Sequence, residues 1–380
     1  MLLQGKCKGK QRRLLALGFT ISLSPAAYAA DPPSPALPFT PPSISTVPSN
    51  GDTNPYGVAF VPDTVPTDGV LKPRDILISN FNNTTMQGLG TTITRIDAHG
   101  ATSTFFTAAQ GVTTQGLTAA LGILKNGFVI VGSLATTDGT DNTTQPGSLS
   151  VIDRKGNLVT VLVSQTYIDG PWGLALNDRG DDKRAQIFIS NVRDGTIVRF
   201  DISYEYDAFK VLRTTVIGKN FNHRLDPAAI VLGPSGLFYD RFTDALFIAS
   251  STDNAIYALA HAGALTAPGT PVTVYSDPTH LRGPLDLVRL PNGNFLVANS
   301  DGSNADPNQP SELVEFTIGG TFVQQMSIDP NTGGAFGVNV LRFDRDLNDK
   351  YRPFDDDGAY LVGAVDDNAV NFQSWTVRGR

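Results

Sequence analysis

Two segments of the chain contain residue types that could do acid–base or ligand-binding chemistry. His223, Arg224 and Asp226 lie close together in "NFNHRLDPAAI", and His280 is followed two positions later by Arg282. A histidine exchanges a proton near neutral pH, and an arginine grips a carboxylate through two parallel hydrogen bonds. These residues are therefore candidates to bind an acidic ligand or polarise a carbonyl group. A structural alternative stays open, in which Arg224 and Asp226 form a local ion pair and the histidines cap turns.

The first 29 residues have the pattern of a secretory signal peptide. Five basic residues precede the apolar run Leu14 to Leu23, which is too short to span a bilayer, and Ala27-Tyr28-Ala29 supplies a cleavage site. A Pro-rich linker follows at residues 30–42. We therefore expect a secreted or periplasmic protein that has no membrane span once the signal is removed.

Charge and cysteine content narrow the function classes. Residues 1–29 hold five Lys and Arg and no acid, so the remaining chain has 24 basic against 36 acidic residues, a net charge of −12. Such a surface repels phosphate backbones, which argues against nucleic acid as a partner. Cys7, the one cysteine, lies within the signal, so the mature chain would have no disulfide and no cysteine nucleophile.

A unit of strands and turns recurs six times between residues 43 and 380. Each unit has an apolar run without alternation that ends in small or polar residues, as in "ILISN" at 76–80 and "IFISN" at 187–191, and most runs follow a Pro-x-Gly start. A strand without alternation is buried on both faces. Four strands per unit and six units predict an all-β fold, a six-bladed β-propeller of four-stranded antiparallel blades. A β-sandwich is the alternative, but it does not explain six similar units.

The last unit lacks a fourth strand, because the chain ends after 369–377. An open edge of this kind exposes unpaired backbone groups. The isolated strand "SISTV" at 43–47 has no unit of its own. We therefore predict that it pairs with 369–377 and closes the ring.

The propeller topology places both candidate segments on one face, together with further residues. Loops that enter a blade and loops that follow its second strand lie on the same side of the ring, which we call the top face. A ligand at the channel mouth on this face would contact Trp172, Asp169, Tyr56 and Phe336. Trp172 could be a platform for a sugar or a flat ring, or it could plug the channel.

These repeats resemble the NHL-type repeat, and the resemblance covers residues 45–380. It implies a six-bladed propeller related to the gluconolactonase-like family, whose members hold a divalent metal on the axis with Glu, Asn and Asp. This chain departs from that pattern, because Tyr56, Trp172, Ser235 or Phe336 stands where such families place a ligating Asn. Only Asp286 and Asn339 put polar groups on the inner strands, which is few for a bound Ca²⁺, since that ion prefers six or more oxygens. Residues 344–355 are somewhat like a calcium loop but lack its glycine.

Two functions follow as hypotheses. In the first, an exported propeller binds a small molecule or a protein partner at the top-face channel mouth, without chemistry. In the second, a metal-assisted lyase or lactone-type hydrolase works at the same mouth through His223, Arg224, Asp226 and His280. Long top-face loops at 133–148 and 300–311 could cover that mouth in either case.

Overall fold

The computed structural model describes residues 43–109, 114–178, 183–205, 208–300, 312–331, 334–343 and 359–378. The predicted signal peptide at 1–29, the linker at 30–42 and the calcium-like segment at 344–355 lie outside these residues. So does most of the loop at 300–311. The described residues all belong to one compact unit that spans Ser34–Arg380.

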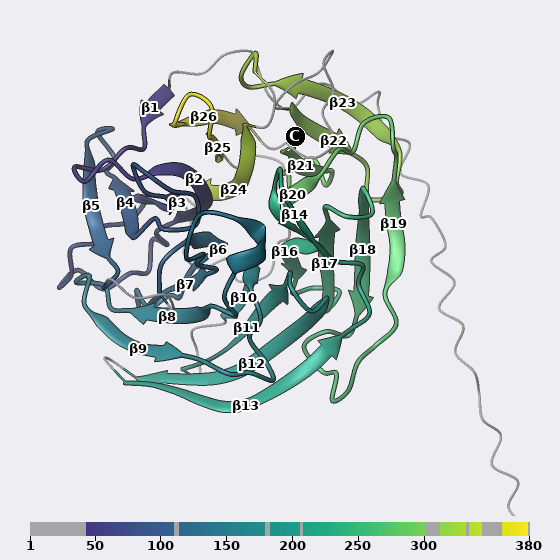
Figure 1. The fold of residues 1–380 in the computed structure, drawn as a ribbon, viewed down its shortest axis with the longest axis horizontal. Coiled ribbons are helices and arrows are strands. Elements are labelled where there is room, and N and C mark those ends of the chain that lie inside the picture. Colours follow the sequence, from purple (N-terminus) through teal and green to yellow (C-terminus); the bar gives the residue numbers. More distant parts are fainter. Residues whose placement is uncertain are drawn as a thin grey trace, which may run out of the picture. The chain divides into compact units, whose positions relative to one another are not determined.

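Six four-stranded antiparallel sheets form the blades of the described structure (Figure 1). In five of them the strands follow one another in chain order from the inside outward, and in the sixth the outermost strand comes from the start of the chain. Blade one contains β2 (Thr53–Phe60), β3 (Ile76–Asn82), β4 (Thr92–Ile96) and β5 (Thr102–Thr107). Blade two contains β6 (Leu117–Ile123), β7 (Val129–Ser133), β8 (Ser148–Ile152) and β9 (Leu158–Leu162). Blade three contains β10 (Pro171–Asp178), β11 (Arg184–Asn191), β12 (Thr196–Glu205) and β13 (Ala208–Gly218).

The other three blades repeat this arrangement. Blade four contains β16 (Pro234–Asp240), β17 (Ala245–Ser250), β18 (Ala255–Ala260) and β19 (Val272–Ser276). Blade five contains β20 (Pro284–Arg289), β21 (Phe295–Asn299), β22 (Glu312–Phe316) and β23 (Phe322–Ser327). Blade six contains β24 (Ala335–Phe343), β25 (Ala359–Asp366), β26 (Asn371–Arg378) and, from the other end of the chain, β1 (Ser43–Ser45). A 3₁₀ turn, η1 (Asp141–Thr143), and the hairpin β14 (Arg224–Asp226) with β15 (Ile230–Leu232) complete the elements.

The inner strands close into a ring. β2, β6, β10, β16, β20 and β24 each contact the next, and β24 contacts β2. The predicted six-bladed propeller is thus confirmed. Close packing between inner strands explains the glycine of the Pro-x-Gly start, because a Cβ on Gly173 would lie 2.0 Å from the carbonyl oxygen of Ser235 in the next blade.

Each apolar second strand is buried on both faces because it serves two neighbouring cores. Ile187 and Ile189 of β11 pack in a cluster with blade two, whereas Phe188 between them packs in a cluster with blade four. The core is thus divided into layers between adjacent blades, and the absence of alternation in the sequence follows directly from this geometry.

The N-terminal strand closes the ring as predicted. Ser43, Ile44 and Ser45 pair antiparallel with Gln373, Phe372 and Asn371 of β26. The strand is shorter than predicted, since it ends at Ser45, but the backbone N–H of Thr46 still donates to the carbonyl of Val370 at 3.1 Å.

Candidate functional site

An aromatic cluster fills the ring at the top face, where the inner strands begin. Tyr56 stacks on Phe336 with ring centroids 4.4 Å apart, and Trp172 meets both Tyr56 and Phe81 edge-on at 5.3 and 5.4 Å. The Trp172 side chain is fully buried, at 1% exposure. Three of the residues expected to contact a ligand therefore contact one another and plug the channel in this structure.

The segment 220–230, which interrupts the repeat, forms the hairpin β14–β15 above this cluster. Ile230 and Val231 are buried and belong to the same hydrophobic core as Tyr56 and Trp172. β14 also contacts η1 in the long loop of blade two, and Figure 1 places β14 toward the middle of the ring. The hairpin and this loop together cover the channel mouth.

The polar residues of the hairpin bond locally, and His223 and Arg224 are exposed whereas Asp226 is half-buried. Arg224 forms an ion pair with Asp226 at 3.2 Å, and Asp226 Oδ1 accepts hydrogen bonds from the backbone N–H groups of Ala228 and Ala229. His223 Nδ1 lies 3.0 Å from the carbonyl oxygen of Phe221, and because a carbonyl oxygen only accepts, Nδ1 donates this hydrogen bond. Asp226 thus holds the tight turn of the hairpin, and His223 keeps one ring nitrogen available.

Asp169 lies near both Arg193 and His223. Asp169 forms an ion pair with Arg193 at 2.6 Å. Burial raises the pKa of this carboxyl group, and the charges of Arg193 and, more weakly, His223 oppose that rise. Asp169 and Arg193 therefore form an ion pair at the rim of the covered mouth, and His223 lies near it.

His280 lies in a different environment, between blades four and five. Its ring stacks on Phe322 of the outermost strand β23 at 3.7 Å, and its Nδ1 lies 2.6 Å from Asp277 Oδ2, which also accepts from the hydroxyl of Tyr275. Burial opposes ionisation of Asp277, but the hydrogen bonds from His280 and Tyr275 outweigh it and lower its pKa. Within the described part of the chain, the side-chain contacts of His280 (Asp277 and Phe322) and of His223 (Phe221) involve different residues. Arg282 is half-buried just before β20. The structure does not join the two histidine segments into one site.

A cavity of about 300 Å³ lies along the axis below the aromatic cluster, lined by the later residues of the six inner strands. Asp286 and Asn339 are the charged and amide side chains in its wall. Asp286 accepts from the backbone N–H groups of Leu287 at 2.9 Å and Val338 at 3.0 Å. Burial raises the pKa of Asp286 to about 7, although these two hydrogen bonds lower it.

Asp286 and Asn339 belong to a belt of hydrogen bonds that links every blade to the next. At four junctions a hydroxyl group bonds to a carbonyl of the following blade: Ser79 Oγ to Thr118 (2.7 Å), Thr118 Oγ1 to Pro171 (2.6 Å), Ser190 Oγ to Ser235 (2.5 Å) and Ser235 Oγ to Pro284 (2.8 Å). At the last two, Asp286 accepts from Val338 N–H, and Asn339 Nδ2 donates to the carbonyl of Val58 at 2.7 Å. Sequence reasoning missed this belt, although the serine near the end of several second strands was a signal for it.

The oxygens of Asp286 and Asn339 are thus already engaged, since Asn339 Oδ1 accepts from Val340 N–H at 2.7 Å. Within the described part of the chain, no group of three or more His, Cys, Asp or Glu side chains is placed to hold a metal ion. Two further top-face carboxyl groups, Asp366 and Asp367, have pKa values raised by burial to about 6 and about 7. A nearby carboxylate adds to the rise in each case, Asp329 for Asp366 and Asp366 for Asp367.

The described residues therefore define an all-β, six-bladed propeller whose channel is plugged at the top face and hollow below. No family model and no curated protein matches the chain. Among solved structures, a luciferin-regenerating enzyme is similar over 90% of this chain and 98% of its own, with 10% identity and a TM-score of 0.50. A periplasmic gluconolactonase of Pseudomonas aeruginosa (16% identity, 74% and 88% covered, TM-score 0.43) and a chain of a nidogen/laminin complex (13%, 75% and 84%, 0.46) are also similar.

These likenesses are likenesses of fold. The six-bladed propeller fold that the resemblance implied is confirmed, and identities of this size say nothing about activity. Among the residues that the structure describes, no helix is long and apolar enough to cross a membrane.

Proposed function

We propose that the protein is an exported propeller that binds a protein partner through its top face, without chemistry of its own at that face. Export rests on the signal-like residues 1–29. The observation that supports binding to a surface is the hairpin β14–β15, which covers the mouth and presents Leu225 with 44% of its side chain exposed, beside exposed His223 and Arg224. An exposed apolar side chain beside polar and charged side chains fits a complementary protein surface better than it fits a small molecule.

The repeat itself does not explain this hairpin. A ring of six blades needs only a short link between β13 and β16, and the inserted segment leaves the apolar side chain of Leu225, in the middle of β14, exposed to solvent. Exposed apolar groups on inserted loops are typical of recognition elements, because loops vary without cost to the framework that carries them.

A photo-crosslinking amino acid at position 225, introduced in the producing organism, tests this proposal. We expect a discrete crosslinked species that purified protein competes away and that Arg224→Ala weakens. The matched control is position 242, because Phe242 is also exposed, at 51%, but lies in the β16–β17 turn on the opposite face. The same species from both positions, or none from position 225, would contradict top-face binding.

One observation favours the alternative, a metal-assisted lyase or lactone-type hydrolase. Asp286 has a pKa of about 7 in a cavity on the axis, and a carboxyl group of this kind can give and take a proton near neutral pH. Its site would be the lower channel and not the covered mouth. Turnover of a panel of lactones that depends on added Ca²⁺ and is lost in Asp286→Asn would support the enzyme. A panel left unreacted, with no bound metal in the purified protein, would oppose it.

A further inference from the structure

A groove of about 600 Å³ lies between blades three and four, on the face opposite the hairpin. Its position follows from the topology: Arg184 begins β11, Asp244 lies in the β16–β17 turn, and Gly263 lies in the β18–β19 turn, all at the lower ends of the blades. Its volume is in the range of small-molecule sites in proteins.

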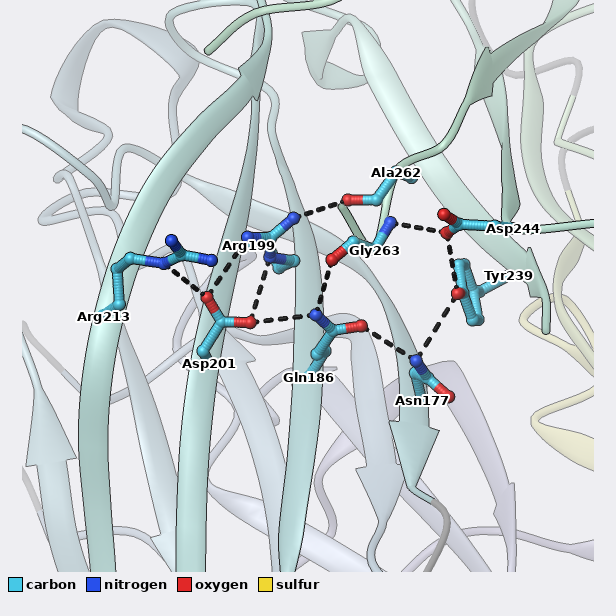
Figure 2. A network of polar contacts seen from close by, with 9 residues as sticks. All are labelled: Asn177, Gln186, Arg199, Asp201, Arg213, Tyr239, Asp244, Ala262 and Gly263. Atoms are coloured by element: carbon cyan, nitrogen blue, oxygen red, sulfur yellow. Dashed lines mark hydrogen bonds and ion pairs between the residues drawn. The ribbon is translucent and has the colours of Figure 1, made fainter. Parts of the chain in front are cut away.

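The floor of the groove is a connected polar network (Figure 2). Asp201 accepts hydrogen bonds from Arg199, from Arg213 Nε at 2.9 Å and from Gln186 Nε2 at 2.9 Å. Arg199 is fully buried and also donates to the carbonyl of Ala262 at 2.7 Å. Burial opposes ionisation of Asp201, but the hydrogen bonds from Gln186, Arg213 and Arg199 outweigh it and lower its pKa. The carboxylate therefore stays charged and holds these side chains in place.

The network continues into blade four. Gln186 Oε1 accepts from Asn177 Nδ2 at 2.8 Å, and the hydroxyl of Tyr239 donates to Asp244 Oδ1 at 2.8 Å. Asp244 Oδ1 also accepts from Gly263 N–H at 2.6 Å. Amide, phenol and carboxylate groups are thus fixed along the floor, where they can exchange hydrogen bonds with hydroxyl groups of a ligand.

The walls of the groove are positively charged in an acidic protein. Arg184, Arg213 and Arg241 line it, against the carboxylates of Asp201 and Asp244. Asp201 is already neutralised from behind by the buried Arg199. Arg213 offers its terminal nitrogens, since its side chain is 55% exposed and only Nε bonds to Asp201. The net positive charge of the groove contrasts with −7 for the whole chain.

We propose that this groove binds a small ligand that has an oxyanion group and several hydroxyl groups. Arg213 and Arg241 grip the oxyanion, because a guanidinium group matches the geometry of a carboxylate or a phosphate. Asn177, Tyr239 and Asp244 hold the hydroxyl groups. The fixed network below Arg213 reduces the entropy lost when the ligand is bound.

Calorimetric titration of the purified protein with three sugars tests the proposal and identifies the anion. Glucuronate and glucose 6-phosphate have the same ring and different oxyanions, and glucose has none. We expect one or both anions to bind and glucose to bind at least about tenfold more weakly. The anion that binds more tightly identifies the chemistry. Raising NaCl from about 0.05 M to about 0.5 M should weaken the complex, because salt screens exposed charges.

Arg213→Gln should lower the affinity for the preferred anion by about tenfold or more, and Arg213→Lys should restore part of it. Arg74→Gln is the matched control, since Arg74 is an exposed arginine that pairs with Asp63 in blade one, away from the groove, and it should leave binding unchanged. Thermal unfolding of each variant separates lost binding from lost folding. Failure of both anions to bind, equal binding of glucose, or an equal effect of Arg74→Gln would each overturn the proposal.

Discussion

The two ends of the ring differ in how their side chains use the same fold. At the top face, Tyr56, Trp172 and Phe336 fill the channel and the hairpin β14–β15 lies over them. At the lower face, the axis keeps a cavity of about 300 Å³ and the junction of blades three and four keeps a groove of about 600 Å³. The top face therefore has an exposed surface that a partner could contact, whereas the lower face has a groove and a cavity.

The two ends of the ring are held together in different ways, by apolar packing at the top face and by side-chain hydrogen bonds in the lower half. The rings of the aromatic cluster join blades one, three and six by direct packing. In the lower half, hydrogen bonds such as those of Asp286 and Asn339 link the blades around the axial cavity. Variants that alter one end of the ring and leave the other intact can separate the contribution of packing from that of hydrogen bonding.

The largest effect should come from the plug itself. Trp172→Ala removes a fully buried indole that contacts Tyr56 and Phe81, and we expect a loss of about 3–5 kcal/mol in the free energy of unfolding. Chemical denaturation followed by fluorescence of the remaining tryptophan, Trp375, measures this loss. Phe242→Ala, which truncates an exposed aromatic at the lower face, should cost less than about 0.5 kcal/mol. Similar losses in both variants would mean that the cluster is not the main link between blades.

Stability should fall as the pH rises through the range set by the buried carboxyl groups. The pKa values of Asp286, Asp366 and Asp367 are raised from 3.8 to about 7, 6 and 7 in the folded protein. Between about pH 4 and pH 7 the folded chain holds more protons than the unfolded chain, so the free energy of unfolding decreases as pH increases.

Urea denaturation at pH 5 and pH 8 measures this change in the free energy of unfolding. Asp286→Asn should remove the part of the change that Asp286 contributes, on the order of 2–4 kcal/mol. Asp97→Asn provides a control, because hydrogen bonds from the backbone of Ala101 and His99 lower the pKa of this exposed carboxyl group, so its replacement should leave the difference between pH 5 and pH 8 unchanged. If Asp286→Asn keeps the full pH dependence, Asp286 is not protonated in the folded protein near neutral pH.

The role of Asn339 can be compared with that of a hydroxyl at another junction. Asn339→Ala leaves the Val58 carbonyl and the Val340 N–H without their side-chain partner, which should cost about 1–3 kcal/mol. Ser79→Ala removes the equivalent link between blades one and two and should cost a similar amount. Thermal unfolding with and without Ca²⁺ distinguishes a link from a metal ligand: stabilisation by Ca²⁺ that only Asn339→Ala abolishes would assign Asn339 to a metal site.

Most of the fold could be predicted from the sequence because it is repeated. Six apolar second strands, most of them after a similar start, report the same local packing six times, and the unpaired strand at 43–47 had one open edge to fill. That counting predicted that 43–47 pairs with 369–377, and the structure sets the register, with Ile44 opposite Phe372. The same pattern occurs in every unit, so one unit whose first strand is hard to recognise, such as the one near Thr118, does not change the prediction.

The candidate site could be predicted only in part, because it depends on what is not repeated. The sequence placed His223 and Asp169 on one face, and the structure brings them close together. It could not show that Ile230 and Val231 would insert into the aromatic cluster, because their burial depends on side chains from other blades. Nor could it find the groove, since Arg213, Gln186 and Tyr239 occupy ordinary strand positions and meet only through the twist of two blades.

The smallest effect is expected for the ion pair of the hairpin, and it tests whether the top face is a binding surface or only a cover. The Arg224 side chain is 51% exposed, and exposed ion pairs contribute little, so Arg224→Ala should change the free energy of unfolding by less than about 1 kcal/mol. Asp226→Ala should cost more, because Asp226 Oδ1 also accepts the N–H groups of Ala228 and Ala229 that form the turn. Thermal unfolding of the two variants gives this order. If Arg224→Ala leaves stability unchanged yet weakens crosslinking at position 225, the guanidinium serves recognition. If it destabilises the chain as much as Asp226→Ala does, its task is to hold the hairpin on the plug.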